Sequence, residues 1–135
     1  MTAVAVLDAS ALLAYLREEP GAEFVAEVIA TGASICTVNL AEALSTAAAH
    51  GADPAELATE LTVRGLLGGA VTVEPFTTAD AIEAARLRPL TRAAGRLSLG
   101  DRACLALARR HGGVAVTADA AWATLSLGID VRPIR

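Results

Sequence analysis

The sequence predicts an α/β fold in which helices cover both faces of a central parallel sheet of four to five strands. Short runs rich in β-branched residues alternate with helical patterns of ten or more residues, and such alternation is typical of parallel sheets. The runs are residues 4–7, 34–38, 71–73 and 114–117, with a weaker fifth at 131–134. No repeat or linker interrupts the 135 residues, so we expect a single domain over residues 1–135.

The boundaries of several elements are marked by capping residues. Asp53 followed by Pro54 is typical of a helix start, and Thr77 with Asp80 and Ser98 with Asp101 resemble capping boxes. Pro133 suits the fifth run to the edge of the sheet. Glycines predict the helix ends: Gly32, Gly51, Gly68-Gly69 and Gly112-Gly113.

The composition excludes several classes of protein. Hydrophobic residues make up 54% of the chain, which excludes a disordered segment. No apolar run approaches the roughly 20 residues that cross a bilayer, and no basic segment precedes the first apolar run, so we expect neither a membrane span nor a signal peptide. Cys36 and Cys104 each lie in an apolar run, and we expect reduced core cysteines in a cytoplasmic protein.

The basic residues are concentrated in one segment. All eleven are arginine, and seven of them lie between Arg86 and Arg110 beside a single acid, Asp101. The net charge of the whole chain is nevertheless −4. A basic segment in an acidic protein favours a polyanionic ligand on one face, although a solvated arginine-rich surface is the structural alternative.

Three acids fall at or near the predicted carboxyl end of the sheet, and a fourth, Asp101, begins the helix that leads into the fourth strand. Asp8 follows the first strand, Asp119 follows the fourth, and Glu42 comes five residues after Thr37, where the second strand is predicted to end. In such sheets the working site lies beyond the carboxyl ends of the strands, where the strand order reverses.

Each acid also has a structural alternative. Asp8 and Asp119 could cap the helices that follow them, Asp101 could serve its capping box, and Glu42 lies beside an apolar stripe. The helical phase of Asp101 favours a functional role in addition to capping, because the apolar residues Cys104, Leu105 and Ala108 share its face. Converging acids without any lysine require protonation or a cation, and ligands that are all oxygen suit Mg²⁺ or Mn²⁺.

Four segments carry a resemblance to a known family: VLDASALLAYL, TVNLAEAL, RLSLGDRACLALARRHG and AVTADAAWATL. In this order and spacing the chain resembles a PIN-domain ribonuclease, and within that family a VapC-type toxin of a type II toxin–antitoxin module. The resemblance runs from about Val4 to Ile134. It implies a three-layer α/β/α sandwich and an Mg²⁺- or Mn²⁺-dependent endoribonuclease that cleaves structured RNA, such as a tRNA or rRNA stem-loop, and inhibits translation.

The resemblance also implies roles for individual residues. The four acidic positions of the family correspond to Asp8, Glu42, Asp101 and Asp119, which would bind metal and catalyse cleavage, with Glu42 either a ligand or the group that orients the attacking water. Ser10 and Thr117 match supporting hydroxyl positions.

Partners follow from the arginines, from the first helix and from the resemblance. We expect RNA to contact Arg86, Arg88, Arg92, Arg96 and Arg102. We expect a cognate antitoxin to cover an apolar surface formed by Leu12, Leu13, Tyr15 and Leu16. The resemblance further implies a homodimer and a toxin–antitoxin hetero-oligomer.

The alternative function is a PIN-like module that binds RNA or protein without cutting. Nucleotide-binding modules are disfavoured, because neither G-x-G-x-x-G nor G-x-x-x-x-G-K occurs in the chain.

Overall fold

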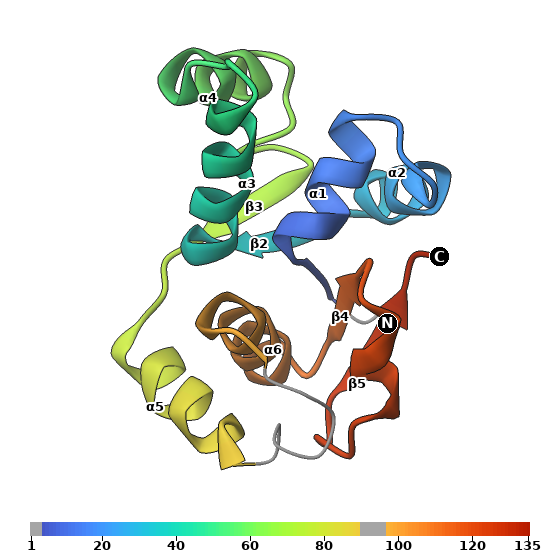
Figure 1. Ribbon diagram of the computed structural model, residues 1–135, viewed down its shortest axis with the longest axis vertical. Coiled ribbons are helices and arrows are strands. Elements are labelled where there is room, and N and C mark those ends of the chain that lie inside the picture. The colour runs from blue at the N-terminus through green and yellow to red at the C-terminus, as the bar shows by residue number, and fades with distance from the viewer. Residues whose placement is uncertain (1–3, 90–96) are drawn as a thin grey trace.

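The computed structural model describes residues 4–89 and 97–135. A parallel sheet lies at its centre, and helices cover both faces of the sheet (Figure 1). Its five strands lie in the order β3-β2-β1-β4-β5, and every neighbouring pair is parallel. The strands are β1 (Ala5–Leu7), β2 (Ala33–Cys36), β3 (Val71–Glu74), β4 (Val114–Thr117) and β5 (Asp130–Pro133). The predicted fold class is confirmed, and the strand that contains Pro133 lies at the edge as expected.

The helices form two layers, each with its own hydrophobic core. The layer on one face comprises α1 (Ala9–Leu16), α2 (Ala22–Thr31), α3 (Thr37–Ala49) and α4 (Pro54–Val63). The layer on the other face comprises α5 (Thr78–Leu87), α6 (Leu99–His111) and the short 3-10 helix η2 (Ala120–Thr124). Cys36, Cys104 and Trp122 are buried in the second core, and both cysteines are free thiols, as predicted.

The predicted capping residues start the helices as expected. Asp53 caps α4 with Pro54 in its first turn, and Thr77 and Ser98 each form a complete capping box. The stripe of Cys104, Leu105 and Ala108 on α6 is fully buried. These features depend on local sequence, which is why the sequence predicts them.

Two predicted boundaries are wrong. β2 ends at Cys36 and α3 begins at Thr37, whose hydroxyl accepts a hydrogen bond from the backbone N–H of Phe76. Helix α4 ends at Val63, before Gly68-Gly69, because Gly65 already takes a positive φ of 83° and turns the chain.

No helix within the described residues is long and apolar enough to cross a membrane.

Candidate active site

Asp8 lies at the carboxyl end of β1, the central strand, and its carboxylate is held by three hydrogen bonds. The Ser10 hydroxyl donates to Oδ1 at 2.7 Å and the backbone N–H of Ala11 at 2.8 Å, while the Thr117 hydroxyl donates to Oδ2 at 2.6 Å. Asp8 is the N-cap of α1, so the structural alternative is realised. The cap accounts for one oxygen only, because Thr117 holds the other from β4.

The two hydroxyls are oriented by the backbone that follows β4. Ser10 Oγ accepts a hydrogen bond from the Ala118 N–H at 2.9 Å, and Thr117 Oγ1 accepts one from the Asp119 N–H at 3.0 Å. Each hydroxyl is thereby free to point its proton at Asp8. The structure thus brings Ser10 and Thr117, the hydroxyls expected to support a metal site, into contact with the Asp8 carboxylate.

This contact crosses the point at which the strand order reverses. The chain adds β2 and β3 on one side of β1, and β4 and β5 on the other. Asp8 follows β1 and Thr117 ends β4, so their hydrogen bond spans the two strands at that point. Ligands of open α/β sheets bind in the crevice at this position.

Glu42 reaches the same region from α3. Its Oε1 accepts a hydrogen bond at 3.1 Å from the side-chain amide of Asn39, and its carboxylate packs directly on the Cα of Gly100 in α6. The residue itself is exposed. The contact with α6 places Glu42 beside the residue that precedes Asp101.

Asp101 is the third residue of α6, and it caps that helix. The Ser98 N–H donates to Asp101 Oδ2 at 2.9 Å, and the Asp101 N–H donates to Ser98 Oγ at 3.1 Å. The capping alternative is therefore realised here too. Asp101 also directly follows Gly100, on which the Glu42 carboxylate packs.

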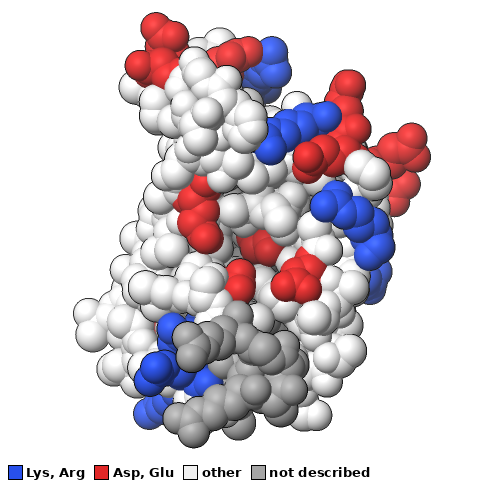
Figure 2. All heavy atoms as spheres, viewed as in Figure 1, with Lys and Arg blue, Asp and Glu red and all other residues white. Residues whose placement is uncertain are grey.

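Burial and neighbouring charges both raise the pKa of two carboxyls in this group, Asp8 and Glu42. Burial raises the pKa of Asp8, against its hydrogen bonds from Thr117, Ser10 and Ala11, and the charge of Asp101 raises it further. Burial likewise raises the pKa of Glu42, against the bond from Asn39, and the charges of Asp101 and Asp8 add to the increase. Figure 2 shows several separate acidic side chains in the middle of this face, with further acidic side chains and the basic ones toward its margins.

Asp119 lies just beyond this group at the end of β4. It is the N-cap of η2, and its Oδ1 accepts a hydrogen bond from the Ala121 N–H at 3.0 Å. Its link to Asp8 runs through Thr117, which accepts the Asp119 N–H and donates to the Asp8 carboxylate. The side chain is exposed, unlike that of Asp8.

The acids have not gathered around a common point. Within residues 4–89 and 97–135, no three His, Cys, Asp or Glu side chains lie close enough together to hold a metal ion. Mutual repulsion and the local hydrogen bonds of each carboxylate account for this spacing. The group nevertheless fits a hard divalent cation in two respects: its ligands are all oxygen, and a positive charge would offset the charge of Asp101, which adds to the effect of burial on the pKa of Asp8 and Glu42.

The predicted RNA-binding arginines differ in their surroundings. Arg86 is exposed and lies 3.6 Å from Glu83, and Arg88 is also exposed. Arg102 is partly buried and donates to the carbonyl of Ala84 at 2.9 Å. Arg92 and Arg96 lie outside the described residues.

The arginine segment is also less free than its sequence implies. Arg110 binds the buried carboxylate of Asp80 through two nitrogens, at 2.9 and 3.2 Å, and Arg109 pairs with Glu83. These acids lie on α5, which packs against α6. With Arg102, three of the seven arginines therefore join α6 to α5 within one layer.

The expected antitoxin surface on α1 requires one correction. Leu12 is fully buried in the core under the helix, so it cannot contact a partner in this structure. Leu13, Tyr15 and Leu16 are partly exposed. The helix is apolar around more than one face because Leu12 lies within the core, while Leu13, Tyr15 and Leu16 pack against its edge.

The sequence reasoning missed two residues of the site, Asn39 and Gly100. Asn39 is 1% exposed and donates to both Glu42 and the carbonyl of Gly100. Its spacing of three residues before Glu42 on a helix is a signal that could have revealed it. No comparable local signal marks Gly100, whose contact comes from another element.

Comparison with known proteins bears on the family and the fold. The model of the PIN domain family matches residues 5–126. No curated protein matches the chain.

Several solved structures share the fold over nearly the whole chain. FitAcB from Neisseria gonorrhoeae is 18% identical, with a TM-score of 0.72 and coverage of 97% of this chain and 98% of that one. DNA-bound VapBC from Salmonella typhimurium is 18% identical, with a TM-score of 0.70 and full coverage of both chains, 100% each. VapBC-5 from Mycobacterium tuberculosis is 24% identical, with a TM-score of 0.60 and coverage of 98% of each chain. These identities demonstrate the fold alone, whereas the family model covers most of the sequence, and the chain therefore belongs to the PIN domain family.

Proposed function

We propose that this protein is a VapC-type toxin of a type II toxin–antitoxin module, acting as a metal-dependent endoribonuclease in the cytoplasm. The observation that carries the proposal is the Asp8 carboxylate, held by Ser10 and Thr117 at the point where the strand order reverses, with Glu42 packed on Gly100 beside Asp101. Membership of the PIN domain family supports it, as does the fold shared with chains described as members of toxin–antitoxin systems.

The acids would hold one or two Mg²⁺ ions, with Mn²⁺ as a substitute. Asp8 and Asp101 are the proposed main ligands, and Asp119 and Glu42 complete the set. When bound, such an ion makes hydroxide available near neutral pH and offsets charge on the phosphate.

The chain's own residues supply orientation and proton transfer. Ser10 and Thr117 keep both oxygens of Asp8 in place through their hydrogen bonds. Glu42, whose Oε1 accepts the hydrogen bond from Asn39, either binds the metal or orients the attacking water and accepts its proton. In-line attack would leave a 5′-phosphate and a 3′-hydroxyl.

The proposed substrate is a structured RNA such as a tRNA or rRNA stem-loop, whose cleavage inhibits translation. The chain has only four aromatic residues of the Phe, Trp and Tyr types, which favours recognition of RNA shape over stacking on unpaired bases. Arg86, Arg88, Arg92, Arg96 and Arg102 remain the proposed phosphate contacts.

The test is cleavage of total cellular RNA by antitoxin-free protein with Mg²⁺, with Mn²⁺ and with EDTA. Asp8→Asn is compared with Asp53→Asn, because Asp53 also caps a helix through its side chain but lies on α4. We expect discrete products that need metal, persist in the Asp53 variant and disappear in the Asp8 variant. RNA that is bound but never cut would refute the proposal in favour of the non-catalytic module.

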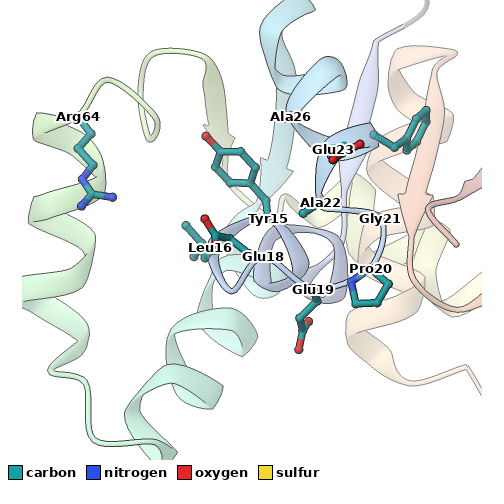
Figure 3. A pocket seen from close by; sticks show the side chains of 11 residues that line it. Tyr15, Leu16, Glu18, Glu19, Pro20, Gly21, Ala22, Glu23, Ala26 and Arg64 are labelled. Carbon is teal, nitrogen blue, oxygen red and sulfur yellow. The ribbon is translucent and has the colours of Figure 1, made fainter.

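A groove beside α1 supports an antitoxin partner. Its volume is about 990 Å³, and Figure 3 shows Arg64, at the end of α4, across the groove from Tyr15 and Leu16. Glu18, Glu19 and Glu23 also line it, so an antitoxin segment with apolar anchors and basic side chains would complement it. A homodimer and a toxin–antitoxin hetero-oligomer are part of the same proposal.

A further inference from the structure

The side-chain amide of Asn39 joins two parts of the active site that lie on different helices. Its Nδ2 donates to Glu42 Oε1 at 3.1 Å and to the carbonyl oxygen of Gly100 at 2.9 Å. Asn39 is 1% exposed, so it is beyond the reach of an RNA substrate. The amide therefore connects α3 to the first turn of α6, next to Asp101.

The orientation of this amide is determined by its partners. Both are acceptors, so only the NH₂ group can face them. The other end of the amide, Oδ1, is buried and has no hydrogen-bond partner among the described residues. A buried, unpaired oxygen lowers stability, so the amide is poorly explained as a device that only strengthens the core.

Gly100 completes the contact by leaving room for the Glu42 carboxylate. A Cβ at this position would lie 2.2 Å from Glu42 Oε1 and 2.6 Å from Oε2. The backbone of Gly100 does not have a positive φ, so its conformation does not require glycine.

The second capping-box helix provides an internal comparison. In α5 the residue between the cap and Asp80 that corresponds to Gly100 is Ala79. A helix start of this type therefore accepts a Cβ at that position, and the requirement for glycine in α6 comes from Glu42.

We infer that Asn39 is a positioning residue that holds the Glu42 carboxylate against Gly100, within the site formed with Asp8 and Asp101. An exposed glutamate has three rotatable side-chain bonds and would otherwise sample many positions. The hydrogen bond from Asn39 and the flat surface of Gly100 restrict it to one. This inference rests on the proposed nuclease function, because Glu42 is the group that it places.

The test compares Asn39→Ala, Glu42→Gln and the double variant under single-turnover conditions with Mg²⁺ and a defined RNA product. Asp80→Asn is the matched control, since Asp80 is also a buried polar residue that joins two helices, yet it lies in α5 away from the site. We expect Asn39→Ala to slow cleavage about 10-fold to 100-fold without changing the KM for RNA. The double variant should be no slower than Glu42→Gln alone. Asp80→Asn should cleave at the wild-type rate.

A second readout does not depend on activity. In metal-free protein, the Asn39 side-chain NH₂ resonances should shift in Glu42→Gln and in Gly100→Ala, and stay unchanged in Asp80→Asn. The inference would be overturned if the losses of cleavage rate in the two single variants multiplied in the double variant. It would also be overturned if the Asn39 NH₂ resonances did not change in Glu42→Gln. If wild-type protein cut no RNA, the proposed function would fail, and the resonances alone would decide whether Asn39 holds Glu42.

Discussion

Replacing Gly100 with alanine should separate catalysis from stability. The new Cβ would lie 2.2 Å from Glu42 Oε1, whereas ordinary contacts begin at 3.4 Å, so the oxygen would have to retreat by about 1.2 Å. That movement breaks the 3.1 Å hydrogen bond from Asn39. The displaced group is the far end of a flexible side chain, so the backbone of α6 can stay where it is.

The two consequences differ in size. A misplacement of about 1 Å in a catalytic group reduces the rate by about 100-fold. Stability changes little, because alanine in place of glycine in a helix contributes about 1 kcal/mol and the lost hydrogen bond of an exposed side chain removes about the same. We therefore expect a large loss of kcat/KM with a free energy of unfolding within about 1 kcal/mol of wild type.

The assay measures RNA cleavage and denaturant unfolding on the same preparations. Ala79→Gly, at the corresponding position of α5, is the control for helix propensity. It should lower the free energy of unfolding by about 1 kcal/mol and leave cleavage unchanged. Wild-type cleavage by Gly100→Ala would refute the reasoning, because Glu42 would then not need its place on α6.

Three further outcomes follow from the site, the second helical layer and the groove. Folding raises the pKa of Asp8, mainly through burial. The metal-free fold therefore loses stability as the pH rises from the unfolded pKa of Asp8 through its folded pKa. Asp8→Asn should therefore raise the metal-free Tm at neutral pH, less so toward acid pH, and abolish stabilisation by Mg²⁺, which thermal scans would measure. Burial alone would raise the pKa of Asp80, but hydrogen bonds from Thr77 and Arg110 outweigh it and lower the pKa, so this carboxylate stabilises the fold above its unfolded pKa. Asp80→Asn should lower the free energy of unfolding at neutral pH by about 1–2 kcal/mol, a figure already reduced for the exposure of Arg110. Denaturant unfolding at a series of pH values should show the difference in stability between variant and wild type disappearing below about pH 4. Leu16→Glu should leave RNA cleavage intact and weaken inhibition by the antitoxin, and equal inhibition of both proteins would remove the groove from the interface.

Local signals in the sequence account for much of the fold. Capping boxes, the proline of the edge strand and the buried stripe that follows Asp101 all appear as predicted, because each depends on residues within a few positions of one another. The placement of Asp8 and Thr117 at the ends of two strands follows from the same kind of pattern. Their adjacency follows from the parallel pairing of β1 with β4.

Predictions that depended on distant partners were less successful. Leu12 belongs to an apolar helix, but only its packing against the sheet shows that it is buried. The arginines of α6 have the composition of a basic face, yet Arg110 finds Asp80 across the helix pair. Such pairings join residues far apart in the sequence, so no window of the sequence contains them.

The sequence by itself determined the α/β class, the starts of α4, α5 and α6, and the places of Asp8 and Asp119 after their strands, because periodicity and capping act over single elements. Only the tertiary structure decided which of those acids lie near enough for the charge of one to affect another. It also showed that each carboxylate accepts hydrogen bonds from its own donors. The tertiary structure alone placed Glu42 against Gly100, with a hydrogen bond from Asn39 to its carboxylate. The physical reason is that these contacts depend on how α3 and α6 meet, and that meeting is set by the packing of both layers on the sheet.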